Sequence, residues 1–168
     1  MDEAKLKSKF NNIFINLLYS VMTNDLSKVR HFLSDEVASK FESIIERNKA
    51  NNETQMYDEL NVKDISISSV EKVDGKEVVK AIIISRYMDY IIDSTTGNYK
   101  RGINDHRVEK INYLTFQKNL DAKDKPIIFK CPHCGADMDI NFTGKCNFCR
   151  KVVDITDYEY ILTDIVTS

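Results

Sequence analysis

The hydrophobic period of this chain changes once, between residues 50 and 60, and that change limits the folds it can adopt. Before the change, apolar residues recur every three or four positions, as they do on one face of a helix. After it they alternate with polar residues, as in strands that bury one face. A helical half followed by a strand-rich half predicts an α+β domain, with helices packed on an antiparallel sheet. The chain is long enough for one domain with a sizeable core, so we expect residues 1–168 to fold as a single unit.

Three helices are expected in the first half. The first runs from Asp2 to about Met22, and its apolar stripe should pack on the core, although such a stripe also suits a membrane-surface anchor. A short second helix is expected over residues 26–33. Ser34 is suited to cap a third helix, which continues to about residue 49 before a polar loop. The stripe of the first helix consists of Leu6, Phe10, Ile13, Phe14, Leu17, Leu18 and Val21.

The second half is expected to form an antiparallel meander. The polar loop at 51–54 leads to a first strand over residues 60–73, with a bulge between Val62 and Ile65 where the alternation slips. Asp74-Gly75 is a hairpin turn signal that leads to the second strand.

The second strand is expected over residues 77–92, and its unbroken apolar run at 81–84 implies burial on both faces. A polar, locally basic loop at 94–106 should precede a third strand through residues 111–116. A last strand is expected over residues 158–166. Consecutive strands joined by hairpins make a meander.

All four cysteines of the chain lie in two Cys-x-x-Cys pairs separated by eleven residues: Cys131, Cys134, Cys146 and Cys149. Two such turns supply the four soft ligands of a closed tetrahedral site, so we predict structural zinc bound by these four thiolates. Two disulfides are the alternative, but the paired spacing and the lack of a visible signal peptide favour metal. His133 should face solvent. Strand-like residues on both sides predict a zinc ribbon at 127–153, inserted before the last strand.

Several short motifs resemble one known family. They are Phe32-Leu33-Ser34-Asp35-Glu36, Tyr90-Ile91-Ile92-Asp93, Thr96-Gly97, Gly102 and Tyr113-Leu114-Thr115-Phe116. With the order of elements, they resemble the domain of mitochondrial inner-membrane translocase subunit 44 and its bacterial relatives, some of which look similar even in having a Cys-Pro-x-Cys-Gly ribbon. The resemblance implies a bacterial member with the cystatin-like cone of nuclear transport factor 2, in which a curved sheet wraps around the long helix. It also implies protein scaffolding at a membrane, with lipid contact.

Charge and hydropathy narrow the functional classes. The 24 basic and 26 acidic residues give a net charge of −2, so no global field attracts nucleic acid or an anionic membrane. No apolar run approaches the roughly 20 residues of a membrane-spanning helix. We therefore expect a cytoplasmic chain, peripheral to or tethered at the cytoplasmic membrane, and leave open whether a membrane segment precedes it.

Catalysis and nucleic-acid binding remain as alternatives. A cone fold can house a pocket acid or base, but Asp105 and His106 are strand neighbours that should point to opposite faces, and the other candidates form no recognisable catalytic set. These others are Asp89, Asp93, Tyr57, Tyr87, Tyr90, Tyr99 and Tyr113. Around the ribbon, Phe142 or Phe148 could stack on a base, beside a modest basic excess from Lys123, Lys125, Lys130, Lys145, Arg150 and Lys151.

The sequence favours a non-catalytic binding or assembly module over an enzyme. We expect a protein partner, with contact to lipid or a membrane surface, and no nucleic acid. The ribbon should present an additional surface at its knuckle tips, Pro132, His133, Asn147 and Phe148. The alternatives are a nucleic-acid-binding zinc ribbon and a small-molecule-binding or enzymatic cone.

Overall fold

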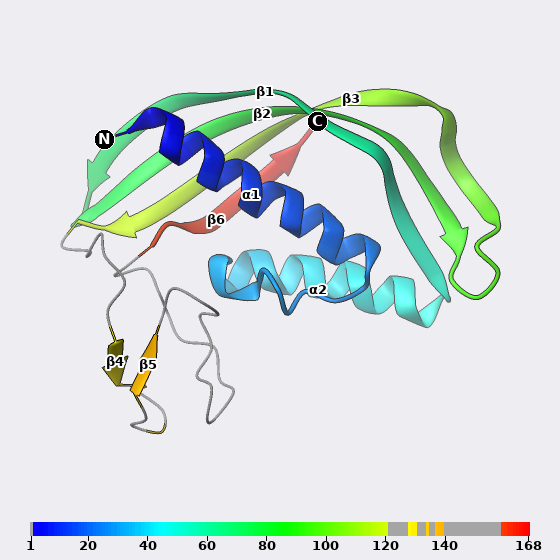
Figure 1. Ribbon diagram of the computed structural model, residues 1–168, viewed down its shortest axis with the longest axis horizontal. Helices are drawn as coiled ribbons and strands as arrows, with labels where there is room; N and C mark the ends of the chain where they lie inside the picture. Colours follow the sequence, from blue (N-terminus) through cyan, green and yellow to red (C-terminus); the bar gives the residue numbers. More distant parts are fainter. Residues whose placement is uncertain (1, 121–127, 131–133, 135–136, 140–158) are drawn as a thin grey trace.

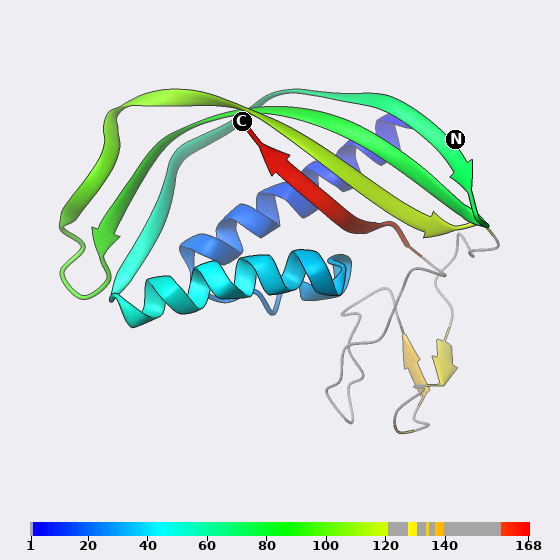
Figure 2. The same cartoon turned by 180° about the vertical axis from the view of Figure 1, so that it is seen from behind.

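A computed structural model describes residues 2–120, 128–130, 134, 137–139 and 159–168. Two helices lie on the concave side of a curved antiparallel sheet (Figure 1), and the reverse view shows the same arrangement (Figure 2). The helices are α1 (Glu3–Met22) and α2 (Asp35–Ala50), and the sheet has the order β1-β2-β3-β6. Its strands are β1 (Glu53–Val73), β2 (Lys76–Asp93), β3 (Tyr99–Asn119) and β6 (Ile161–Thr167). The predicted α+β class and the meander are confirmed.

Both long helices begin at a side-chain cap: Asp2, which was expected within the first helix, and Ser34, which was the predicted cap. The Asp2 side chain accepts a hydrogen bond from the Lys5 backbone N–H at 3.2 Å, and Ser34 Oγ accepts one from the Val37 N–H at 3.3 Å. These bonds satisfy N–H groups that have no partner within the helix. The whole apolar stripe of α1 is buried against the sheet and α2, so the core-packing interpretation is confirmed and the membrane-anchor alternative is wrong.

The predicted second helix is wrong. Residues 26–33 contain only a 3₁₀ turn, η1 (Arg30–Phe32), although Leu26 and Val29 are buried as expected. The segment is too short to offset the cost of nucleating an α-helix. It also has to end extended, because Leu33 forms a parallel bridge with Leu162, and the Ser34 N–H donates to the Leu162 carbonyl at 2.9 Å.

Two strands begin earlier than predicted. β1 starts at Glu53 instead of residue 60, and β3 starts at Tyr99, within the predicted loop at 94–106. Residues 99–107 are exposed on both faces, so no apolar alternation marks them as a strand. These early segments form the end of the sheet that curls down beyond the helices, at the right of Figure 1.

The predicted bulge and hairpin turn are confirmed. The register of β1 against β2 shifts between Val62 and Asp64, and also at two further places along β1. Asp74 and Gly75 both have positive φ, 51° and 75°, which is the conformation of a two-residue turn whose twist matches that of the flanking strands.

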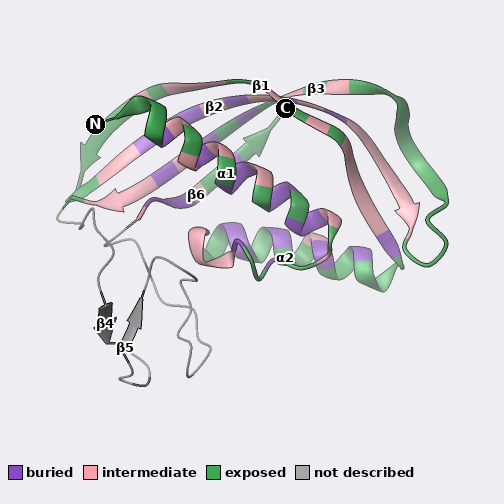
Figure 3. Ribbon diagram, in the orientation of Figure 1, coloured by how far each residue is buried: buried purple, intermediate pink, exposed green. Residues whose placement is uncertain are grey.

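The apolar run in β2 is not buried on both faces. Ala81 and Ile83 are almost fully buried under the helices, whereas Ile82 and Ile84 on the outer face are only partly buried. Figure 3 shows burial concentrated where the sheet faces the helices. The continuous apolar run therefore makes both faces of β2 apolar at this point. Within the described part of the chain, only the inner face is covered.

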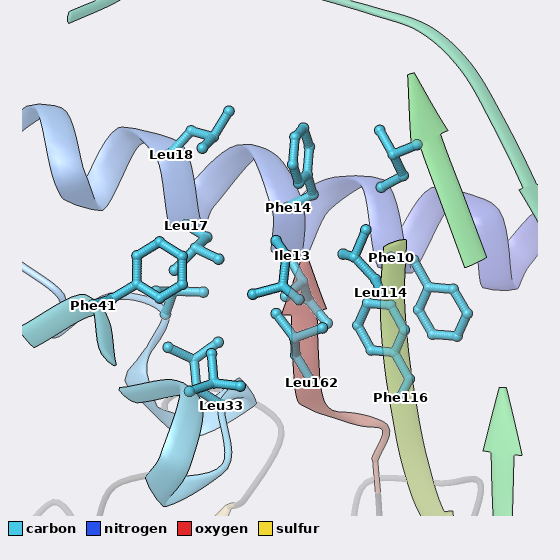
Figure 4. Packing of buried hydrophobic residues seen from close by; sticks show 14 of the residues in the cluster. Phe10, Ile13, Phe14, Leu17, Leu18, Leu33, Phe41, Leu114, Phe116 and Leu162 are labelled. Carbon is cyan, nitrogen blue, oxygen red and sulfur yellow. The ribbon is translucent and has the colours of Figure 1, made fainter. Parts of the chain in front are cut away.

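The core joins both helices to β2, β3 and β6. The rings of Phe10 and Phe116 stack with centroids 3.8 Å apart and planes 5° from parallel. Figure 4 shows Leu114 and Phe116 of β3 and Leu162 of β6 beneath the α1 side chains, with Phe41 of α2 beside them. β6 pairs with β3, so the last strand is as predicted, although it begins at Ile161.

Candidate functional site

The predicted zinc site lies almost entirely outside the described residues. Cys134 is exposed in a turn between β4 (Ile128–Lys130) and β5 (Asp137–Asp139), which pair in antiparallel fashion. The other three cysteines, His133 and the remaining knuckle tips lie outside the described part. Within that part, no group of three or more histidine, cysteine or acidic side chains could hold a metal. The donor set itself, four thiolates in two Cys-x-x-Cys pairs, fits zinc, and the site remains a prediction.

The outer face of the sheet carries an apolar patch. Ile82, Tyr113 and Val166 are register partners across β2, β3 and β6, and Ile84 pairs with Ile111 in the next outward-facing row. Tyr113 is 46% exposed and Val166 is 51% exposed, and both helices lie on the opposite face (Figure 1). We call Ile82, Ile84, Ile111, Tyr113 and Val166 the outer patch.

Charged residues of both signs border the outer patch. On one side, Glu109 Oε1 accepts from Lys63 Nζ at 3.2 Å and from Arg86 Nε at 3.1 Å, and these two bonds lower the pKa of Glu109. On the other side lie Lys80 and Asp164, each a register partner of Thr115. An apolar centre with a polar rim is the usual anatomy of a protein interface.

Three of the predicted site residues meet on the concave face, at the curled end of the sheet. Tyr57 and Asp89 are register partners, and Tyr87 lies two residues before Asp89 on the same face. The rings of Tyr57 and Tyr87 are 4.9 Å apart between centroids, and Gln55 Nε2 donates to Asp89 Oδ1 at 2.7 Å. Burial, with the charge of Asp89, raises the pKa of Tyr57 to about 12. We call Tyr57, Tyr87 and Asp89 the concave cluster.

The other predicted acid and base candidates lie apart from this cluster. Asp93 Oδ1 accepts backbone N–H bonds from Thr95 and Thr96 within the β2–β3 turn, and the bond from Thr96 contributes most to lowering the pKa of Asp93. Asp105 Oδ1 lies 2.8 Å from His106 Nδ1, although the two were expected to point apart. Both side chains are largely exposed, so they can turn toward each other along the strand edge.

The remaining tyrosine candidates have other roles. The Tyr90 hydroxyl donates to Asp58 Oδ2 at 2.8 Å, and the Tyr99 hydroxyl donates to the Gly102 carbonyl at 2.6 Å. Tyr113 belongs to the outer patch. Neither contact brings an acid or base to the concave cluster.

Sequence reasoning missed Glu53, a buried carboxylate at the start of β1. Its two oxygens accept from Arg101 at 3.0 and 2.8 Å, and Lys100 donates to Oε1 at 3.0 Å. The bonds from Arg101 and then Lys100 lower the pKa of Glu53 to about 2. This contact ties the first strand to the third, and no local sequence pattern could have revealed it, because its partners follow almost fifty residues later.

A groove of about 340 Å³ lies between α2 and the segment that follows α1. Arg30 and Lys49 line it, and their charges are already matched by acidic neighbours: Arg30 contacts Glu42 and Asp35, and Lys49 contacts Glu46. The third acidic residue of the groove, Asp25, is exposed, and its Oδ1 accepts a hydrogen bond from the Ser27 backbone N–H at 2.9 Å.

The helices, the curved meander and the two contrasting faces define an α+β domain with surfaces suited to binding. A family model described as a Tim44-like domain matches residues 1–127. The match covers most of the chain, and the protein belongs to the Tim44-like domain family. It ends before the first cysteine pair, so all four cysteines lie outside the matched residues. No curated protein matches the chain.

Among the residues described, none belongs to a helix long and apolar enough to cross a membrane.

Proposed function

We propose that this protein is a non-catalytic, membrane-associated binding module that holds a protein partner on the outer patch. The observation that carries the proposal is the row of Ile82, Tyr113 and Val166 on a sheet face that no described helix covers. Membership of the Tim44-like family supports a role in assembly near a membrane.

The charges around the outer patch favour a protein over a lipid surface. Lys63, Lys80 and Arg86 are balanced by Glu109, Asp164 and Asp64, the last of which pairs with Ile84. An anionic membrane would attract a surplus of basic residues, whereas a rim of mixed sign can match the charge pattern of one particular partner. Association with the membrane would then be indirect, through that partner.

A structural zinc ribbon is the second element of the proposal. The four thiolates would fill the coordination shell, and the metal would supply the folding free energy that so small a module lacks. The ribbon would add a second contact surface beside the sheet. Purified under reducing, chelator-free conditions, the protein should contain one zinc ion per chain, and a metal-free preparation or cross-linked cysteines would contradict this element.

The outer patch can be tested with a photo-reactive amino acid placed at Tyr113 or, as the control, at Tyr19. Tyr113 is 46% exposed and Tyr19 is 50% exposed, but Tyr19 lies on the solvent-exposed side of α1. We expect one discrete cross-linked product from position 113 in native membranes and cells, and none at the same mass from position 19. Mass spectrometry would identify the partner.

The identified partner, once purified, should bind the Tyr113→Asp variant about tenfold more weakly or worse, since a charge replaces an aromatic ring that the partner would bury. Circular dichroism would establish that the variant is folded. Equal cross-linking from both positions, or unchanged affinity of Tyr113→Asp, would overturn the assignment of the partner to this face.

A further inference from the structure

Asp89 is a partly buried carboxylate on the concave face. Its register partner Tyr57 packs against the core, which places both side chains on the helix side of the sheet. Gln55 donates to one carboxylate oxygen. Among the described residues, no lysine, arginine or histidine forms an ion pair with Asp89. Arg101 of β3 is in register with Gln55 of β1, with Ile91 of β2 between them. Its guanidinium already forms an ion pair with Glu53. A negative charge thus lies in an aromatic setting without a matching cation.

Two tyrosine rings lie on the same face as this carboxylate. Tyr87 is only 5% exposed, and its ring packs against that of Tyr57 with centroids 4.9 Å apart. Burial, the charge of Tyr57 and that of Asp89 raise the pKa of Tyr87, so both phenols are neutral near neutral pH and keep their electron-rich faces.

The surroundings hold the cluster in place. Met22, at the end of α1, accepts the Tyr57 backbone N–H on its sulfur at 3.3 Å. On the β3 side, a side chain at Gly102 would come within 2.6 Å of the Asp89 carbonyl oxygen, so glycine allows the strands to approach closely here. The cluster is therefore built on packed backbone and not on a loose loop.

We propose that Tyr57, Tyr87 and Asp89 form a binding site for a small primary alkylammonium ion. A carboxylate beside aromatic faces is the chemistry that recognises organic cations. The uncommitted Asp89 oxygen and the phenol oxygens are acceptors, which suits a cation that carries N–H donors. A divalent metal would need more anionic oxygen ligands than the single carboxylate offers. This site lies on the opposite face from the outer patch and does not depend on the proposed protein partner.

The test is a titration of the full-length protein, labelled with carbon-13 in its tyrosine rings, with n-butylammonium chloride. Signals of Tyr57 and Tyr87, assigned with the Tyr57→Phe and Tyr87→Phe variants, should shift and saturate. Sodium chloride at equal concentration should leave them unchanged. Tetramethylammonium should bind more weakly, because it has no N–H to donate. Equal shifts with sodium, or equal affinity for tetramethylammonium, would overturn the proposal.

The Asp89→Asn variant keeps the shape of the side chain and removes its charge. It should bind n-butylammonium roughly tenfold more weakly, which corresponds to the loss of a charge-assisted hydrogen bond. Asp105→Asn is the matched control, because Asp105 is an exposed aspartate on β3, and its affinity should equal that of the wild type. Unchanged affinity in Asp89→Asn would contradict the site. Tyr113→Asp should bind n-butylammonium with the affinity of the wild type. Failure of the amine-site proposal can therefore be distinguished from failure of the proposed partner site on the outer patch.

Discussion

The two faces of the sheet are built from alternate residues of the same strands, yet they have different surroundings. In β3, Leu114 and Phe116 point to the helices and are buried, whereas Ile111 and Tyr113 point outward and are exposed. Their composition is similar, so composition does not distinguish a core from a contact surface. The difference comes from α1 and α2, which cover one face only. An exposed apolar sheet face that no other element covers is typical of an interaction site for a partner.

The largest expected effect on stability comes from a substitution on the concave face. Phe116→Ala should destabilise the protein by about 3–5 kcal/mol, because it removes a fully buried ring that stacks on Phe10 and leaves a cavity. Urea unfolding followed by circular dichroism would measure the free energy of unfolding. A loss close to zero would mean that the concave face is not the core, and the comparison of the two faces would fail.

A moderate effect on stability is expected at Asn112, a buried polar residue of that face. Its amide donates to the Ile83 carbonyl at 2.9 Å and to Ser85 Oγ at 3.0 Å, and its oxygen accepts from Thr167 at 2.8 Å. Asn112→Ala should cost about 1–3 kcal/mol, since it leaves buried polar groups without partners. Hydrogen exchange should show faster opening of β6, which this side chain ties to the sheet. Unchanged protection of β6 would contradict that role.

A smaller, pH-dependent effect is expected for Glu53. Its pKa is lowered to about 2 in the folded state from 4.5, so the contact stabilises the protein above the unfolded-state pKa and is lost as the pH falls toward 2. Glu53→Gln should be less stable than the wild type at neutral pH, and the difference should shrink through that acidic window. Arg101 and Lys100 are partly exposed, so water compensates for part of the loss. A difference that is constant with pH would contradict the ion pair.

Features that depend on residues close together in the sequence were predicted, and features that depend on tertiary contacts were missed. The cap at Ser34 and the turn at Asp74 depend on short-range chemistry, and the structure confirms them. The early start of β3 was missed, because residues 99–107 have no buried face and therefore no period.

The candidate sites show the same division. Tyr57, Tyr87 and Asp89 were all named from the sequence, but as scattered residues, because only the register of β1 against β2 brings them together. The run at 81–84 predicts that Ile82 and Ile84 of the outer patch are buried, whereas they are only partly buried, since an apolar run does not show which of its faces another element covers. The zinc site, which rests on spacing alone, remains a prediction.

The smallest stability effect, and the sharpest test of the comparison, is expected at Tyr113. Tyr113→Ser removes an aromatic ring of similar size to that of Phe116 from the opposite face of the same strand, three residues earlier. Its cost should nevertheless stay within about 0.5 kcal/mol, the usual range for surface substitutions. Urea unfolding beside Phe116→Ala would give both values. A loss above roughly 2 kcal/mol would mean that the chain itself covers the patch, since only buried side chains cost that much. A stable Tyr113→Ser that also binds the identified partner more weakly would separate folding from binding on the two faces of one strand.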